Sequence, residues 1–229
     1  MNPGQQQKPH VYVINLKHRT DRKKQFQTAW SAAKENHGVP TKNVHWYSAV
    51  LGSDLSDKQL NSFRIMAKTR KARAGRVGCY CSHTAAIQKA IRHNHFPLLV
   101  LEDDAVPTPH IDDIADLFAD APYQAALLYF GALPVVARKR VKTYCQGRDG
   151  WFTPGSSSEQ LYGGHAYGFA TKEAAQEVVD FLTKNKMTFD SALVRYTKLN
   201  RNRVAVHCPF QFVQAEGYSN IEGMLRPIR

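Results

Sequence analysis

Short apolar runs alternate with amphipathic segments along the first half of the chain. Val11 to Leu16 is rich in β-branched and aromatic residues, and Leu98 to Glu102 is apolar up to its last residue. Both runs are typical of strands, the second of a strand buried on both faces. Between such runs, apolar residues recur at helical spacing. The pattern predicts strands at 11–16, 44–47, 98–102 and 125–130, and helices at 21–36, 56–63, 84–93 and 111–119.

The second half has a more mixed pattern. Leu161 to Ala170 alternates small and aromatic residues, Thr171 caps a helix, and Phe189 begins another helix before a strand at 204–206. Strands that alternate with helices predict an α/β fold, a Rossmann-type mixed sheet sandwiched by helices. We expect a loose polar leader over 1–10 and a single domain over 11–229.

Several connecting segments look irregular. Met66 to Gly75 is basic and has too few large apolar residues to pack, so we expect a mobile loop that orders over a bound anion. Lys139 to Pro154 has the composition of an irregular crossing or hairpin, Ser156 to Ser158 that of a flexible turn, and Gly131 is expected to close a strand.

Three acids, Glu102, Asp103 and Asp104, follow the buried strand at 98–102. Because side chains alternate along a strand, we expect Glu102 and Asp104 on one side and Asp103 on the other. Acids at the carboxyl end of such a strand lie where open α/β sheets bind ligands, and their oxygens suit Mg²⁺ or Mn²⁺. A solvated acidic turn is the structural alternative.

Two further segments carry candidate ligand groups. After the first strand, Thr20 is a good helix N-cap and Asp21 suits a first turn, while Arg19 and Arg22 supply positive charge where such units commonly hold a nucleotide. Ser82-His83 is expected near the start of the helix that leads into the acidic strand. A satisfied structural histidine is the alternative there.

Composition narrows the class of protein. The 229 residues include 31 Lys and Arg against 19 Asp and Glu, a formal charge of +12 that attracts polyanions. Aromatic residues are not interleaved with the basic patches, so no specific nucleic-acid platform is indicated. No window has the apolar length of a membrane span or a secretory signal. The four cysteines do not form a disulfide scaffold, and we expect free thiols in a reducing compartment.

Five separated motifs agree with one family. They are Ile14-Asn15-Leu16 with Arg19, Asp21 and Arg22; Gly78 with Ser82-His83; Leu101-Glu102-Asp103-Asp104; Ala166-Tyr167-Gly168 before a helix; and Phe189-Asp190. In order and spacing they resemble glycosyltransferase family 25, the lipopolysaccharide-type galactosyl- and glucosyltransferases related to procollagen galactosyltransferases. The likeness runs from about residue 11 to 219.

The resemblance implies a GT-A fold, a UDP-sugar donor and a divalent cofactor, Mn²⁺ or Mg²⁺. It divides the domain into a nucleotide-sugar-binding half, 11–105, and an acceptor half with a C-terminal wrap, 106–229. Carried over by position, Glu102 and Asp104 would hold the metal ion. The donor-binding residues would be Ile14, Asn15, Leu16, Arg19, Arg22, Ser82, His83 and Asp103.

The resemblance also implies inversion at the sugar, hence one displacement with one general base. We expect Asp190 to be the base, with Glu216 second and helix capping as the structural alternative for Asp190. His207 after a late strand is a candidate third metal ligand, and 214–219 a candidate donor or acceptor contact. A metal and basic side chains would stabilise the leaving diphosphate.

These inferences predict a metal-dependent inverting transferase that moves a sugar, a hexose in the simplest case, to a hydroxyl of a glycan, glycolipid or glycoprotein. The alternatives are a metal-dependent nuclease and a non-catalytic domain that binds glycan or nucleic acid. The basic charge suits an anionic acceptor and equally a membrane surface. We expect a cytoplasmic protein, with peripheral membrane association as an open alternative.

Overall fold

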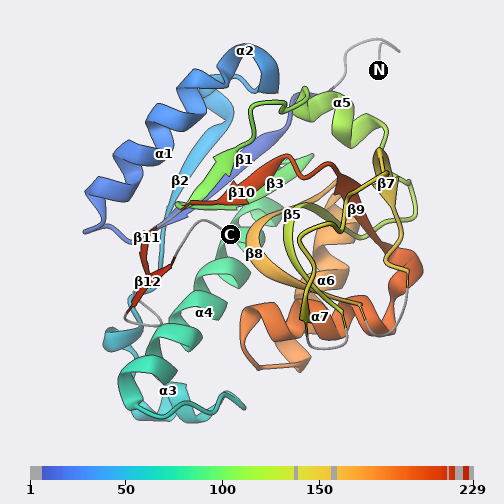
Figure 1. Ribbon diagram of the computed structural model, residues 1–229. Coiled ribbons are helices and arrows are strands. Elements are labelled where there is room, and N and C mark those ends of the chain that lie inside the picture. The colour runs from blue at the N-terminus through green and yellow to red at the C-terminus, as the bar shows by residue number, and fades with distance from the viewer. Residues whose placement is uncertain (1–6, 137–138, 156–158, 216, 220–223, 227–229) are drawn as a thin grey trace.

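The computed structural model describes residues 7–136, 139–155, 159–215, 217–219 and 224–226. A mixed sheet forms its centre (Figure 1), with strands in the order β2-β1-β3-β8-β5-β9-β7 and β6 paired to β5. The strands are β1 His10–Asn15, β2 Val44–Ser48, β3 Leu98–Glu102, β5 Leu127–Val136, β6 Lys139–Arg140, β7 Gly150–Phe152, β8 Glu159–Phe169 and β9 Val204–Cys208.

Five strands of the sheet run in one direction. β1 is parallel to β2 and β3, and β5 is parallel to β9, whereas β8 is antiparallel to both β3 and β5. The carboxyl ends of β1, β2, β3, β5 and β9 therefore lie along one edge, where open α/β sheets bind ligands. The predicted α/β class and the Rossmann-type, GT-A-like mixed sheet are confirmed.

Helices cover both faces of the sheet (Figure 1). Tyr12 of β1 packs with α4, α6 and α7, whereas Val11 and Val13 pack with α1 and α5, as strand alternation requires. Leu98 to Leu101 in β3 are fully buried between the two layers, as predicted. The helices are α1 Thr20–Ala32, α4 Arg70–His93, α5 Ile114–Ala119, α6 Lys172–Lys184 and α7 Phe189–Leu199.

A small second sheet returns the C-terminal part of the chain to the acids. β4, Ala105–Pro107, follows the acids directly and pairs with β10, Phe212–Gln214. The Ala215 N–H donates to the Asp104 carbonyl at 2.8 Å. The remaining elements are α2 Lys34–His37, α3 Asp57–Asn61, the 3₁₀ turns η1 Thr41–Asn43, η2 Gly52–Asp54 and η3 Arg201–Arg203, and the strand pair β11 Gly217–Ser219 and β12 Met224–Arg226.

The helix expected at 84–93 is much longer than predicted. α4 begins at Arg70, and the Thr69 hydroxyl caps it by accepting from the Ala72 N–H at 3.1 Å. Six of the ten residues in the segment expected to be a mobile loop are therefore helical, because Lys, Arg and Ala are strong helix formers and Val77 is fully buried. Ser82 lies in the middle of this helix, and the expectation that it sits near the start is wrong.

Three boundaries also differ from prediction. Thr20 is the first residue of α1, and the cap position is occupied by Arg19, which makes no side-chain cap. α1 ends at Ala32, and the short α2 continues to a left-handed Gly38 with φ of 65°. Gly131 does not close β5; the strand continues through a register shift against β8.

The cysteine expectation is wrong for one pair. Cys145 and Cys208 form a disulfide across 63 residues, whereas Cys79 and Cys81 are not disulfide-bonded. The bond arises from tertiary structure, because β7 pairs with β9 and brings Gly150 opposite Cys208. Sequence spacing alone does not show this proximity.

The ends of the chain fit the expected organisation only in part. His10 belongs to β1, so the expected leader ends at least one residue earlier. The expected turn at 156–158 lies outside the described residues. None of the described helices combines the length and the apolar character needed to cross a bilayer.

Candidate functional site

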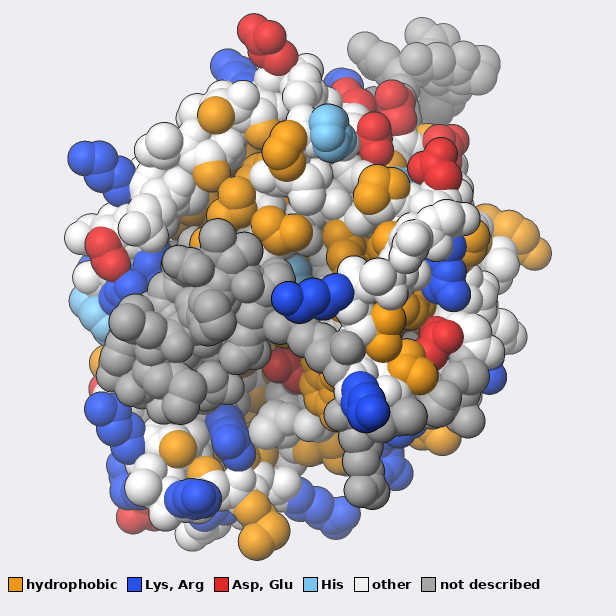
Figure 2. Space-filling model, in the orientation of Figure 1, with side chains coloured by type: hydrophobic (Ala, Val, Ile, Leu, Met, Phe, Trp, Pro, Cys, Tyr) orange, Lys and Arg blue, Asp and Glu red, His pale blue; other side chains and the backbone are white. Residues whose placement is uncertain are grey.

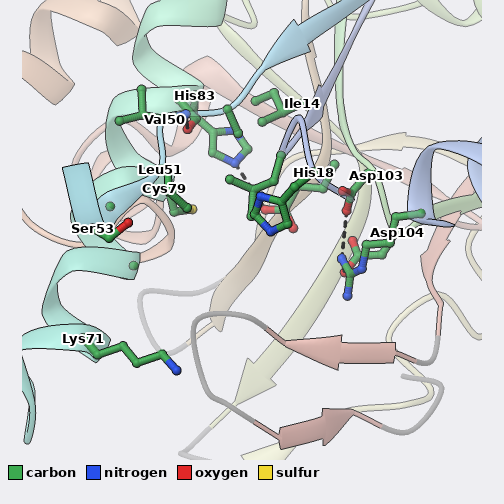
Figure 3. A pocket seen from close by; sticks show the side chains of 17 residues that line it. Ile14, His18, Val50, Leu51, Ser53, Lys71, Cys79, His83, Asp103 and Asp104 are labelled. Carbon is green, nitrogen blue, oxygen red and sulfur yellow. Dashed lines mark hydrogen bonds and ion pairs between the residues drawn. The ribbon is translucent and has the colours of Figure 1, made fainter. Parts of the chain in front are cut away.

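A cavity of about 340 Å³ opens at the carboxyl ends of β1, β2 and β3. Its walls come from the chain after β1 and β2, one side of α4 and the acidic turn after β3 (Figure 3). The lining residues are Ile14, Leu16, His18, Arg22, Ala49, Val50, Leu51, Gly52, Ser53, Lys71, Gly75, Cys79, Ser82, His83, Glu102, Asp103 and Asp104.

Close packing of the 49–53 loop on α4 forms one wall. A Cβ on Gly78 would lie 2.8 Å from the Val50 carbonyl oxygen, so only glycine allows this approach. Ser82 secures the same contact, because its hydroxyl donates to the Gly78 carbonyl at 2.6 Å and accepts from the Val50 N–H at 2.8 Å. Ser82 thus lines the cavity and also holds its wall.

The three acids do not divide between two sides as predicted. β3 ends at Glu102, and Asp103 and Asp104 lie on a turn, where strand alternation no longer applies. Arg22 Nη1 donates to Asp103 at 2.8 Å and to Asp104 at 3.2 Å. The amide of Asn15 donates to the second oxygen of Asp103 at 2.7 Å. Asp103 and Asp104 thus share a guanidinium, and Glu102 turns towards α4.

Asp104 is the most unusual of the three acids. Burial, followed by the nearby charge of Glu102, raises its pKa to about 7, although Arg22 opposes that rise. Its Oδ2 accepts from Gln214 at 3.2 Å, but its buried Oδ1 has no hydrogen-bond partner among the residues that the structure describes. A buried carboxylate oxygen without a partner is costly unless a cation satisfies it. This oxygen therefore fits a cation bound at Asp104, and Glu102 lines the same cavity.

His83 connects the cavity to the second half of the chain. Its Nε2 lies 3.2 Å from Glu102 Oε1, its Nδ1 lies 2.9 Å from the Tyr167 hydroxyl, and its ring stacks on Phe189 at 4.0 Å. Burial lowers the pKa of His83 to about 4, so the ring is neutral at pH 7. A neutral ring carries only one N–H. When the Nε2–H donates to Glu102, Nδ1 carries no proton and accepts from the Tyr167 hydroxyl.

The structure shows a further group of potential ligand atoms and places the third predicted metal ligand, His207, elsewhere. Cys79, His83 and Glu102 each offer a ligand atom within 4.8 Å of the others, which makes a second set of candidate ligands on the cavity wall. His207 is not brought to the acids. Its strand, β9, is separated from β3 by β8 and β5. At about 4.8 Å between neighbouring strands, β9 lies roughly 14 Å from β3. Its Nδ1 lies 3.0 Å from the Pro209 carbonyl oxygen.

The predicted base lies beside this network. Asp190 is exposed in the first turn of α7, and its Oδ1 accepts from the Gly164 N–H at 2.9 Å. Thr188 caps α7, so the capping alternative for Asp190 is wrong. The second candidate base, Glu216, lies outside the described residues.

The predicted donor residues are only partly assembled. Ile14, Leu16, Arg22, Ser82, His83 and Asp103 line the cavity, whereas Asn15 supports Asp103 from behind. Arg19 is outside the lining and pairs with Asp21 at 2.8 Å. Its positive charge therefore forms an ion pair with an acid in the first turn of α1.

Sequence reasoning missed several lining residues. His18, Leu51, Ser53 and Cys79 carried no recognised signal, and Lys71 belonged to the segment expected to be a loop. Figure 3 shows the Lys71 side chain extending from α4, and Figure 2 shows other Lys and Arg side chains over the lower part of that face, around α3 and α4. The two helix glycines, at 75 and 78, were the available signal that another segment packs closely on α4.

Comparison with known proteins identifies the family of the chain. The model of the family described as "Glycosyltransferase family 25 (LPS biosynthesis protein)" matches residues 8–193. A "Glycosyltransferase 25 family member" of Anopheles gambiae is 30% identical over 133 residues, which cover 53% of this chain and 21% of that protein. One of Aedes aegypti is 29% identical over the same coverage. The chain thus spans about a fifth of the length of the curated relatives it matches.

Proposed function

The chain belongs to glycosyltransferase family 25, and on that premise we propose that it transfers a sugar from a UDP-sugar to a hydroxyl group of a glycan or glycoconjugate. The observation that carries the proposal is the cavity at the strand ends, which three acids line and in which one buried oxygen of Asp104 has no partner among the described residues. A nuclease or a binding module has no comparable support from the family match.

The cavity has the two kinds of surface that a nucleotide sugar needs. Ile14, Leu16 and Leu51 form an apolar wall against which a base can lie. Arg22 supplies positive charge beside the acids, and Lys71 supplies it from α4 (Figure 3). We propose that the base occupies the apolar wall and that the diphosphate lies between the acids and Lys71.

Glu102 and Asp104 would hold the Mn²⁺ or Mg²⁺ ion, which would neutralise the negative charge that develops on the leaving diphosphate. Arg22 would act on the same charge from the other side of the acidic turn. Because Arg22 is held by two carboxylates, its guanidinium is fixed in place before the substrate arrives. Neutral His83 would keep Glu102 oriented through its Nε2–H.

Inversion requires one base on the acceptor side of the sugar, and we propose Asp190 for that role. Its Oδ1 is held by the Gly164 N–H, and its residue is exposed to solvent, so an acceptor hydroxyl can reach it. The acceptor would be anionic, because the chain carries a formal charge of +12. A cytoplasmic location and peripheral membrane association stay predictions.

A thermal-shift screen tests the donor and the metal together. UDP-sugars are titrated with and without Mn²⁺ into the chain, Asp104→Asn and the control Asp120→Asn, which changes an exposed acid at the end of α5. We expect one UDP-sugar to raise the melting temperature only with metal, and Asp104→Asn alone to lose the shift. A shift that Asp104→Asn retains would contradict the metal assignment. No shift with any donor would favour a nuclease or binding module.

A further inference from the structure

Three histidines meet at the edge of the sheet opposite the cavity. His10 begins β1, His45 is the second residue of β2, and His95 lies shortly before β3. Because these strands are parallel, their amino ends gather at one edge. Nδ1 of His10 lies 3.0 Å from Nε2 of His45, and one ring nitrogen from each histidine lies within 4.8 Å of the others.

We propose that His10, His45 and His95 form a binding site for Zn²⁺, separate from the metal site of the cavity. Zinc bonds imidazole nitrogens at about 2.0–2.1 Å, so two nitrogens on a tetrahedral ion lie roughly 3.3 Å apart. The His10–His45 distance is already close to that value. Three imidazoles would leave the fourth position of the ion to water.

The present ring positions need only a limited change to bind the ion. The His10 and His95 rings stack at 4.1 Å with 3° between their planes, so their lone pairs run side by side and do not converge. Rotation of a ring about its Cβ–Cγ bond brings a nitrogen towards the others. All three residues are partly exposed, which leaves room for this rotation. The Tyr12 hydroxyl, 3.0 Å from His95 Nδ1, leaves the other nitrogen of that ring available.

The charges around the cluster determine which ions it selects. Lys89, Arg92 and His93 surround it with basic groups. Such surroundings disfavour Mg²⁺ and Ca²⁺, which need oxygen ligands, whereas Zn²⁺ binds imidazole through a strong coordinate bond. The negative end of α4, two residues before His95, partly offsets the basic charge. The site should therefore discriminate sharply between these ions.

Such an ion would act on stability rather than on catalysis. It would cross-link β1, β2 and the segment before β3, the part of the sheet on which the cavity is built. The proposal is independent of sugar transfer, and its test uses no activity measurement.

Calorimetric titration of Zn²⁺ into the untagged chain tests the proposal. Since Cys79, His83 and Glu102 are a second set of possible zinc ligands, the titration is repeated on Cys79→Ser. We expect the chain to bind one equivalent of Zn²⁺ and to bind it equally in Cys79→Ser and in Asp104→Asn. Titration of Mg²⁺ should release no heat of binding at this site. His45→Gln should lower the affinity for this Zn²⁺ ion by at least about 100-fold. Loss of a hydrogen-bond partner of a metal ligand already lowers metal affinity 10–100-fold, and this variant removes a ligand itself.

His110→Gln is the matched control, since His110 is exposed in the turn after β4 and lies outside the cluster. It should bind Zn²⁺ as the unchanged chain does, and circular dichroism verifies that each variant is folded. If His45→Gln does not fold, His95→Gln makes the same test. The proposal fails if the chain binds no Zn²⁺ at a zinc concentration of about 100 µM. It also fails if His45→Gln and His95→Gln, where they fold, still bind Zn²⁺ as the unchanged chain does.

Discussion

Asp190 differs from an ordinary acid in the first turn of a helix. The cap of α7 is already supplied by Thr188, whose hydroxyl accepts from the Ser191 N–H at 3.4 Å. Asp190 reaches across to β8 and binds the backbone of Gly164, close to the His83 ring, which would lie 3.4 Å from a Cβ on that glycine. This places a carboxylate beside the cavity network without a structural need for its charge.

We therefore predict that Asp190→Asn keeps donor affinity and loses turnover. The amide oxygen of asparagine can still accept from the Gly164 N–H, so the local structure should remain, but the proton acceptor is lost. Removal of a general base typically lowers kcat by about 100-fold or more. Steady-state kinetics with the donor found by the thermal-shift screen measure the change. Asp180→Asn, an exposed acid on α6, is the control, and unchanged turnover in Asp190→Asn would place the base elsewhere.

The positions of the site residues were predicted best where they depended on strand ends. Arg22, His83 and the acids were assigned from strand–loop–helix order and the family motifs, and the structure brings them together. The failures came from tertiary geometry. A turn after Glu102 replaced the expected alternation of the acids, and sheet order placed His207 several strands away.

At the scale of elements, α4 and the loop after β2 act as one unit. Gly52 lies against the Ala74 carbonyl, and Gly78 lies against Val50. These contacts allow the helix to form one wall of the cavity along its side. They also explain why sequence reasoning shortened the helix, because a basic segment with few large apolar residues indicated a loop until the packing partner was known.

Gly78→Ala tests the contact between α4 and the loop, because helix propensity and overpacking change the free energy of unfolding in opposite directions. In an exposed helix interior, alanine stabilises by roughly 0.5–1 kcal/mol relative to glycine. Here the new methyl group would lie 2.8 Å from the Val50 oxygen and 3.0 Å from the Gly52 nitrogen, both in the backbone. Overpacking of this kind costs about 1–3 kcal/mol. We predict a net decrease in the free energy of unfolding, measured by urea denaturation, together with weaker donor binding.

Gln88→Gly provides the reference, since Gln88 is exposed on the same helix and reports helix propensity alone. It should destabilise the chain by up to about 1 kcal/mol and leave donor affinity unchanged. A stabilised Gly78→Ala with normal donor binding would show that the loop does not need this close approach.

At the scale of the whole molecule, the disulfide joins the last part of the sheet. Cys145 and Cys208 close a loop of 63 residues, for which the chain-entropy estimate is up to about 4 kcal/mol of stabilisation. We predict that the double variant Cys145→Ser, Cys208→Ser has a lower melting temperature by roughly 10 °C. A reductant should lower the melting temperature of the unchanged chain to that of the double variant and have no effect on the double variant.

Cys81→Ser is the control, because Cys81 is a free thiol on α4. A melting temperature that does not respond to reductant would contradict a stabilising disulfide. The same measurement bears on the expected cytoplasmic location, since disulfides persist in oxidising compartments and are rare in the cytosol. A strong dependence on the bond would favour an oxidising compartment.

The whole molecule should also lose stability on the acid side of neutrality. The pKa values of His10 and His83 are lowered to about 4, mainly by burial, and those of His37, His45 and His95 are also lowered. In the unfolded chain these groups titrate near 6.5. Between pH 6.5 and 4 the unfolded state therefore binds more protons, and the free energy of unfolding falls as the pH falls. Asp104 acts in the opposite direction, because its raised pKa favours the folded state in acid, but it is one group against five.

His37 isolates this effect away from both proposed metal sites. Its Nδ1 accepts from the Val39 N–H at 3.1 Å and its Nε2 lies 3.2 Å from the Trp30 carbonyl oxygen, so protonation at Nδ1 breaks the first bond inside a fully buried position. His37→Gln should lower stability at pH 7.5 but flatten its decline towards pH 5, measured by urea denaturation with chelator present. His110→Gln, which changes an exposed histidine, should keep the original slope. If the free energy of unfolding of His37→Gln depends on pH as it does in the unchanged chain, the prediction is wrong. A histidine that is buried and neutral in the folded chain binds a proton on unfolding in acid, and its removal must change that dependence.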